Sequence, residues 1–180
     1  MSFIKEIVDA YDGGYLEEVK KKFYSPGGQF SYQPMKGVIT VDGTKISISF
    51  NETQGVLSPV DPVRIILHLD VKSNISLNIF PSTYWDSIVN YFAYPKPNNG
   101  SKKLNSQFSF RGDKQLINKL LIDQVFIENI VDEYFYITIN KSDTNKVLLT
   151  PAHGIQNLDH FKKMMNVLKQ IESQIKAIPN

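Results

Sequence analysis

A chain of 180 residues that is 42% hydrophobic and 21% charged has the composition of one water-soluble globular domain, so we expect a single domain over residues 1–180. The apolar content is too high and the net charge of +2 too small for intrinsic disorder. The absence of cysteine excludes a disulfide framework, a thiol nucleophile, an iron–sulfur cluster and cysteine-bound zinc.

The N-terminal segment, residues 1–24, has large residues at a spacing of four, which predicts an amphipathic helix. Gly13 and Gly14 indicate a kink or a division into two helices. Charges of both signs cover the polar face, so we expect the helix to pack on the protein's own sheet; a membrane surface or a partner is the alternative. The large residues are Phe3, Ile7, Tyr11, Tyr15, Val19 and Phe23.

The N-terminal segment also indicates where in the cell the protein is expected. Glu6 and Asp9 interrupt the place where a signal peptide needs an unbroken apolar stretch. No run of residues approaches the roughly 20 apolar residues that span a bilayer. We therefore expect a cytoplasmic protein without a membrane span.

From Gln29 to Phe80, apolar and polar residues alternate, which predicts an antiparallel meander with one face exposed. Asp42 and Gly43 separate two alternating runs and form a strong hairpin signal, because glycine accepts the positive φ that a type I′ turn requires. Another alternating run covers Val63–Val71.

Three strands are then each expected to lead through a turn into a helix. The helices are predicted over Thr83–Phe92, over the stretch from Leu116 to Ile130, and over residues 157–178 at the C-terminus. Residues 94–103 are rich in proline and asparagine and are expected to form a mobile loop. The expected N-cap residues are Ser82, Asp113 and Asn157.

Within the second half of the chain, one stretch has a recognisable order of elements. Its residues are Phe108–Asp113, Leu120-Leu121, Phe135–Ile139 and Val147–Pro151. With this order of strand, acidic cap, leucine pair and hairpin, the stretch from Gln107 to Ile171 resembles uncharacterised bacterial α+β domains of unknown function. The resemblance implies a bacterial intracellular module without enzymatic activity, and it carries over no catalytic or ligand-binding residue.

No reactive constellation is visible in the sequence. The three histidines, His68, His153 and His160, lack the spacing of a metal site, and no nucleophile elbow, phosphate loop or dinucleotide fingerprint occurs. The excess of two positive charges and the scarcity of arginine argue against nucleic-acid binding. We expect no metal and no cofactor, and we lean towards a protein that is not an enzyme.

Two groups of residues are the candidate binding sites. Arg64, His68 and Asp70 share one strand face by alternation. If the protein is an enzyme whose catalytic residues come together only in the folded chain, this is where we would look for them first. A cluster of aromatic residues follows in the chain, beside the lysine-bearing loop, and its exposed members are candidates for partner contacts. These members are Tyr84, Tyr91 and Tyr94.

The sequence therefore predicts an α+β fold. A mostly antiparallel sheet of about seven or eight strands is packed by the N-terminal amphipathic helix and the long C-terminal helix. The leading functional hypothesis is a non-catalytic intracellular interaction module that binds another protein. The alternative is a small-ligand or lipid-binding domain with a cavity between sheet and helices, and an enzyme is the weaker third possibility. The oligomeric state stays open.

Overall fold

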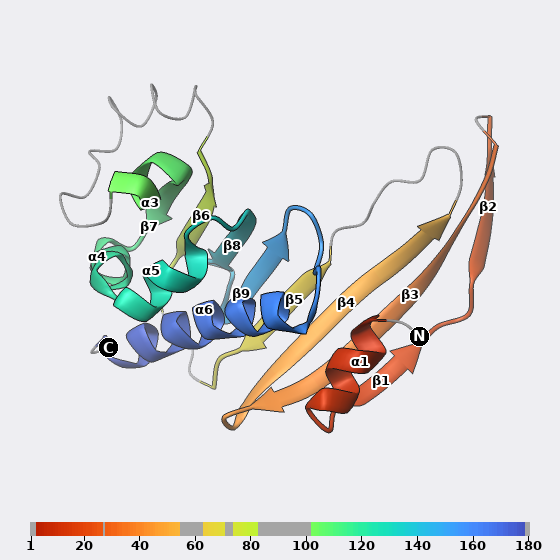
Figure 1. The fold of residues 1–180 in the computed structure, drawn as a ribbon, viewed down its shortest axis with the longest axis horizontal. Helices are drawn as coiled ribbons and strands as arrows, with labels where there is room; N and C mark the ends of the chain where they lie inside the picture. Colours follow the sequence, from red (N-terminus) through yellow and green to blue (C-terminus); the bar gives the residue numbers. More distant parts are fainter. Residues whose placement is uncertain (1–2, 27, 55–62, 71–73, 83–101, 179–180) are drawn as a thin grey trace. The chain divides into compact units, whose positions relative to one another are not determined.

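The chain divides into two compact units, residues 1–68 (unit 1) and residues 69–180 (unit 2). The computed structural model describes residues 3–26, 28–54, 63–70, 74–82 and 102–178, and Figure 1 labels their helices and strands. The single domain expected from the sequence stays a prediction.

Unit 1 is built around its longest strand, β3 (Gly28–Val41). On one edge, β3 pairs antiparallel with β4, which pairs in turn with β5 (Figure 1). On its other edge, β3 pairs with β1 and β2 in succession. The remaining elements of the unit are α1 (Phe3–Ala10), β1 (Gly14–Glu17), β2 (Lys21–Ser25), β4 (Thr44–Gln54) and β5 (Arg64–His68).

The turn between β3 and β4 confirms the predicted hairpin. Val41 lies opposite Thr44, and the two residues between them, Asp42 and Gly43, both have positive φ, 46° and 77°. Positive φ at both central positions is the signature of a type I′ turn, whose twist matches that of the flanking strands.

The helix predicted over residues 1–24 is wrong beyond Ala10. Asp12 has a φ of 49°, and the amide of Gly13 donates to the carbonyl of Val8 at 2.8 Å, which closes α1 with a Schellman motif. The residues that follow form β1 and β2. A spacing of four is even, so it keeps side chains on one face of a strand as well as on one face of a helix.

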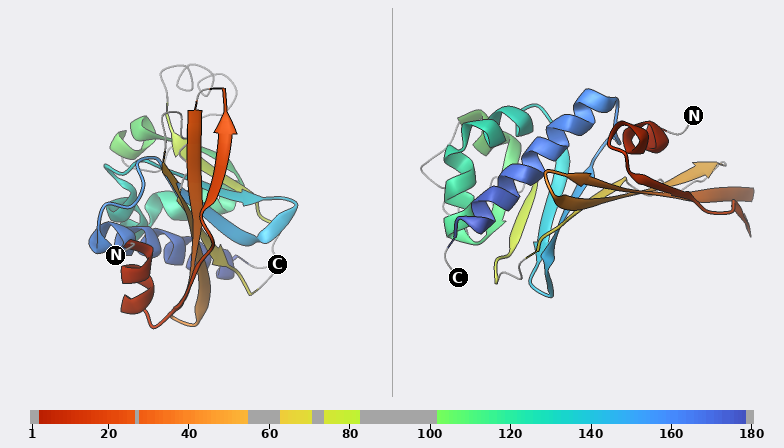
Figure 2. Two further views of the ribbon diagram at one scale, coloured as in Figure 1. Left: turned by 90° about the vertical axis from the view of Figure 1, so that its right-hand side faces the viewer. Right: turned by 90° about the horizontal axis from the view of Figure 1, so that it is seen from below.

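α1 packs on one face of the unit 1 strands, as the right-hand view of Figure 2 shows. Its residues Ile4, Ile7 and Val8 are buried. A Cβ added to Gly37 of β3 would lie 2.5 Å from Cγ2 of Val8 and 3.3 Å from Cγ2 of Ile4, so the helix approaches the strand where a side chain is missing. The buried strand residues on this face are Met35, Ile39, Ile46, Ile48, Ile65 and Leu67.

Unit 2 has four antiparallel strands in the order β9-β8-β6-β7. α6 lies on one side of these strands beside α4 and α5 (Figure 1). Its elements are β6 (Leu77–Pro81), α3 (Lys102–Gln107), β7 (Phe108–Gly112), α4 (Lys114–Ile122), α5 (Gln124–Ile130), β8 (Phe135–Asn140), β9 (Asp143–Pro151) and α6 (Leu158–Lys176).

The pairing in unit 2 corrects the predicted meander. β3, β4 and β5 follow one another as expected, but β6 pairs with β7 and β8. Alternation of apolar and polar residues identifies a strand and its buried face, and it contains no information about the partner strand.

Two of the expected N-caps are confirmed. The Asp113 carboxylate accepts from the amide of Leu116 at 2.9 Å, and the Asn157 side chain accepts from the amide of His160 at 2.8 Å. The helix expected from Leu116 to Ile130 is divided at Asp123, which ends α4 and caps α5. Lys102 and Lys103 begin α3, whereas the helix predicted over residues 83–92 and the rest of the loop predicted over 94–103 lie outside the described residues.

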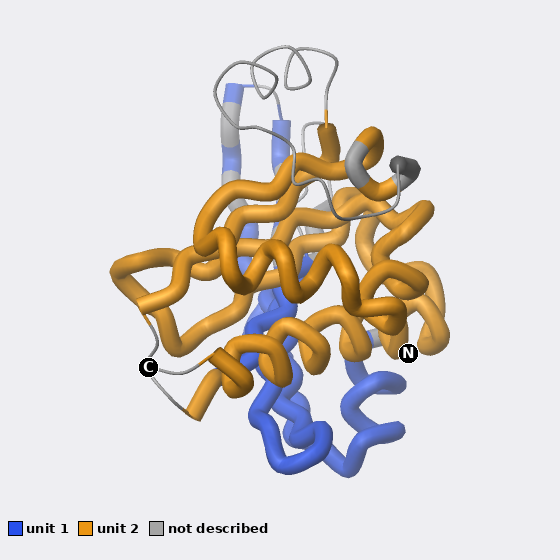
Figure 3. Tube along the Cα trace, turned by 90° about the vertical axis from the view of Figure 1, so that its left-hand side faces the viewer, with its two compact units in different colours: residues 1–68 blue, residues 69–180 orange. Residues whose placement is uncertain are grey.

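The predicted fold class is confirmed. The described residues form nine strands, with antiparallel pairing, and include both the N-terminal helix and a C-terminal helix of 19 residues. Figure 3 colours the two units separately. Within the part of the chain that the structure describes, no helix is long and apolar enough to cross a bilayer.

Candidate functional site

On the side opposite α1, the unit 1 strands present a face whose side chains are exposed or half-buried, and we call it the open face. Because successive side chains of a strand point to opposite faces, its members alternate with the buried residues that face α1. Two of its large apolar members are well exposed, Leu16 to 57% and Val38 to 39%. The open face includes Leu16, Lys36, Val38, Thr40, Lys45, Ser47, Ser49, Arg64, Ile66 and His68.

The charge of the open face is predominantly positive. Lys36 forms an ion pair with Glu18, with an Nζ–Oε1 distance of 2.8 Å. Lys45 and Arg64 are exposed, and neither forms an ion pair with any residue that the structure describes.

The Glu18–Lys36 pair makes a testable prediction about titration. The hydrogen bond and the charge of Lys36 lower the pKa of Glu18 below its ordinary value of 4.5. A lowered folded-state pKa means that the stabilisation is present above pH 4.5 and is lost as the pH falls through the folded-state pKa. We expect Lys36→Met to raise the pKa of Glu18 towards 4.5, measured by NMR titration of its carboxyl carbon. An unchanged pKa in this variant would show that the pair does not form in solution.

Of the predicted cluster Arg64, His68 and Asp70, the first two lie on β5 in unit 1 and belong to the open face. Nε2 of His68 is 2.9 Å from Oγ of Ser47 on the neighbouring strand. Asp70 follows β5 and belongs to unit 2, so we do not include it in the open face. The predicted contact residues Tyr84, Tyr91 and Tyr94 lie outside the described residues and stay a prediction.

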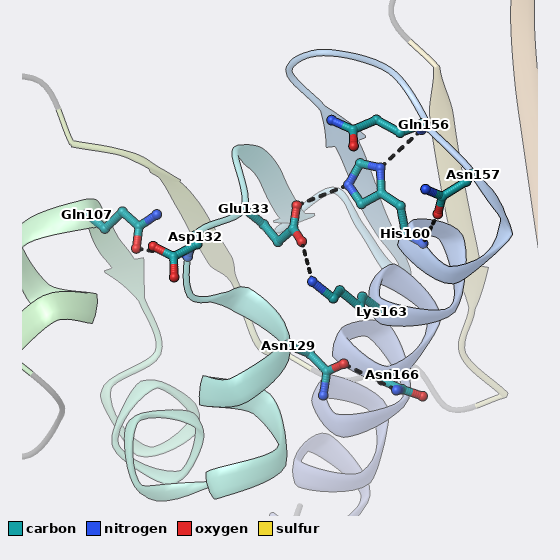
Figure 4. A network of polar contacts seen from close by, with 9 residues as sticks. All are labelled: Gln107, Asn129, Asp132, Glu133, Gln156, Asn157, His160, Lys163 and Asn166. Atoms are coloured by element: carbon teal, nitrogen blue, oxygen red, sulfur yellow. Dashed lines mark hydrogen bonds and ion pairs between the residues drawn. The ribbon is translucent and has the colours of Figure 1, made fainter.

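A polar network in unit 2, which no local sequence pattern predicts, joins the start of α6 to the segment before β8 (Figure 4). Glu133 contacts His160 at 3.1 Å through Oε2 and Lys163 at 2.9 Å through Oε1. The amide of Gln156 donates to Nδ1 of His160 at 3.1 Å. Since Nδ1 accepts, Nε2 carries the proton and donates to the carboxylate. Both ring nitrogens are engaged, so this histidine acts as a structural link.

A second cluster surrounds a buried carboxylate on α6. Glu172 is 2% exposed, and its two oxygens each lie 2.7 Å from a lysine, Lys169 on one side and Lys176 on the other. The hydrogen bond to Glu172 raises the pKa of Lys176. Together with Ser173 these residues line a recess of about 210 Å³. Its charged lining differs from the apolar cavity that the lipid-binding hypothesis requires.

The described residues contain no group of three histidine or acidic side chains arranged to hold a metal ion. The remaining histidine, His153, packs its ring against Tyr134, with ring centroids 6.0 Å apart. We take the open face as the candidate site.

No family model and no curated protein matches the chain. A solved structure, that of the mycobacterial trehalose monomycolate transport factor A, TtfA, is similar with a TM-score of 0.57. The similarity covers 98% of this chain and 94% of that chain, at 13% sequence identity. It shows the fold. At this identity the likeness extends to the arrangement of the chain and not to individual side chains, so the open face is argued from this protein's own residues.

Proposed function

We propose that this protein is a non-catalytic interaction module that binds another protein through the open face of unit 1. The observation that carries the proposal is the combination of exposed apolar residues, Leu16 and Val38, with exposed cations on one sheet face. An apolar patch bordered by polar residues is typical of an interaction site.

The other polar clusters support a role without catalysis. His160 has both ring nitrogens engaged, and the Glu172 carboxylate is neutralised by two lysines. Because internal partners hold both groups, we assign each of them a structural role. The solved structure of similar fold is that of a transport factor, which is in keeping with a binding role.

The test compares two matched pairs of substitutions. Leu16→Ser with Val38→Ser removes the apolar residues of the open face, whereas Ile122→Ser with Val125→Ser removes residues of similar exposure, 68% and 45%, from unit 2. In affinity capture from the native cell extract, we expect a protein retained by the wild-type chain to be lost from the open-face variant. The same protein should be retained by the unit 2 variant.

Thermal unfolding of both variants checks that the fold is intact. Equal retention by the two variants would contradict the proposal, because the open face would then contribute nothing to binding. The alternative of a small-ligand or lipid-binding domain predicts instead that organic extraction of the purified protein releases a bound small molecule, and that the open-face variant keeps it.

A further inference from the structure

A row of three residues, apolar at both ends, crosses the centre of the open face. Val38 lies opposite Ser47, which in turn lies opposite Ile66, so the three residues cross β3, β4 and β5 in one line. Val38 is exposed and Ile66 is half-buried, with a serine between them. We call these three residues the central row.

Cations lie on both sides of the central row. Ser49 lies two residues along β4 from Ser47, and its partners on β3 and β5 are Lys36 and Arg64. In the opposite direction along β4, Lys45 lies two residues from Ser47. Two residues of a strand span about 7 Å, so Lys45 lies about 14 Å from the row of Lys36 and Arg64, with the central row midway. Because Lys36 is already paired with Glu18, Arg64 on one side and Lys45 on the other are the two flanking cations that have no ion pair among the described residues.

We infer that the partner presents an acidic amphipathic helix to the open face, with apolar side chains on the central row and carboxylates on both sides. The inference rests on the proposed function and names its partner class. A helix with its side chains is about 10–12 Å wide, which fits between cations about 14 Å apart. A helix-in-groove mode of recognition uses this pattern of apolar stripe and charged borders.

An anionic membrane would also attract cations, but the observations favour a protein. Each lysine or arginine near a charged membrane contributes about 1 kcal/mol, and the open face has three, of which Lys36 is already paired with Glu18. The whole chain has a net charge of only +2. The cations border apolar residues on two sides, which suits a segment of limited width.

The probe is a synthetic helical peptide of about 14 residues, four turns, with one leucine stripe bordered on both sides by glutamates. A second peptide has glutamine in place of every glutamate. We expect the glutamate peptide to bind and to perturb the NMR amide signals of β3, β4 and β5, and the glutamine peptide to bind at least tenfold more weakly. Added salt should weaken the binding of the glutamate peptide.

Matched variants locate the charges. Lys45→Gln with Arg64→Gln should weaken binding of the glutamate peptide about fivefold, because two exposed ion pairs are lost. Lys114→Gln with Lys141→Gln removes the same charge from exposed positions of unit 2 and should leave binding unchanged. Val38→Ser should weaken both peptides, which tests the open face separately from its charges.

Three results would overturn the inference. The first is equal binding of the two peptides, or no binding of the glutamate peptide. The second is an equal effect of the two charge variants. The third is a protein that binds phosphatidylserine vesicles but not the peptide, and whose binding to vesicles is lost in the variant with Lys45→Gln and Arg64→Gln. That result would assign the open face to a membrane. If Val38→Ser weakens the peptides while the charge variants do not, the open face stands and only its acidic partner is wrong.

Discussion

Gly37→Val is expected to lower the free energy of unfolding by about 3 kcal/mol, because inserting a side chain into a packed core forces neighbours to move. Even a Cβ at this position would lie 2.5 Å from Val8 of α1, and valine adds two methyl groups beyond it. α1 has only eight residues, so it has few other contacts with which to stay docked. Chemical denaturation measures the change.

Gly14→Val is the matched control for this prediction. Gly14 lies on β1, and an added Cβ would meet nothing within 4 Å. We expect a change within about 0.5 kcal/mol, as for other exposed positions. Equal effects of the two substitutions would show that α1 does not pack on β3 at Gly37.

Replacing Lys169 and Lys176 together with methionine is expected to cost about 3 kcal/mol at neutral pH. The double variant leaves Glu172, which is 2% exposed, without either cation, and an uncompensated buried charge is strongly destabilising. Adding Glu172→Met should recover most of the loss, because a buried ion cluster can be replaced by apolar residues at little cost. Denaturation of the double and triple variants provides the comparison.

The same cluster predicts a dependence on alkaline pH. Glu172 raises the pKa of Lys176 above 10.5, so the stabilisation from the pair is complete below pH 10.5 and is lost as the pH rises through the folded-state pKa. The triple variant lacks the pair and should lose less stability over this range than the wild-type protein. A double variant as stable as the wild-type protein would contradict the burial of the Glu172 charge.

Local signals in the sequence predicted the elements that depend on neighbouring residues. The Asp42-Gly43 turn, the caps at Asp113 and Asn157, and α6 were all predicted because each depends on side chains a few positions apart. The step of four from Tyr11 to Tyr15 predicts a helix, but the same step also keeps side chains on one face of a strand. Only the pairing of Tyr15 with Gly37 of β3 shows that this residue lies in a strand.

The candidate site could not be predicted from the sequence, because its residues come together only through the register of the paired strands. Alternation in the sequence places Arg64 and His68 on one face, but it does not bring Lys36 or Lys45 to that face. Those two lysines join them through the pairing of β3, β4 and β5. The Glu133–His160 contact spans 27 positions of the chain, so no local pattern could indicate it.

Site-specific photo-crosslinking in the native cell tests the central claim most directly. A photoreactive amino acid is placed singly at Leu16, Val38 and Ile66 on the open face and at Ile122 on unit 2. We predict that the three open-face positions crosslink to the same protein and that position 122 does not. Crosslinking of a partner from position 122 alone would contradict the assignment of the open face as the binding surface.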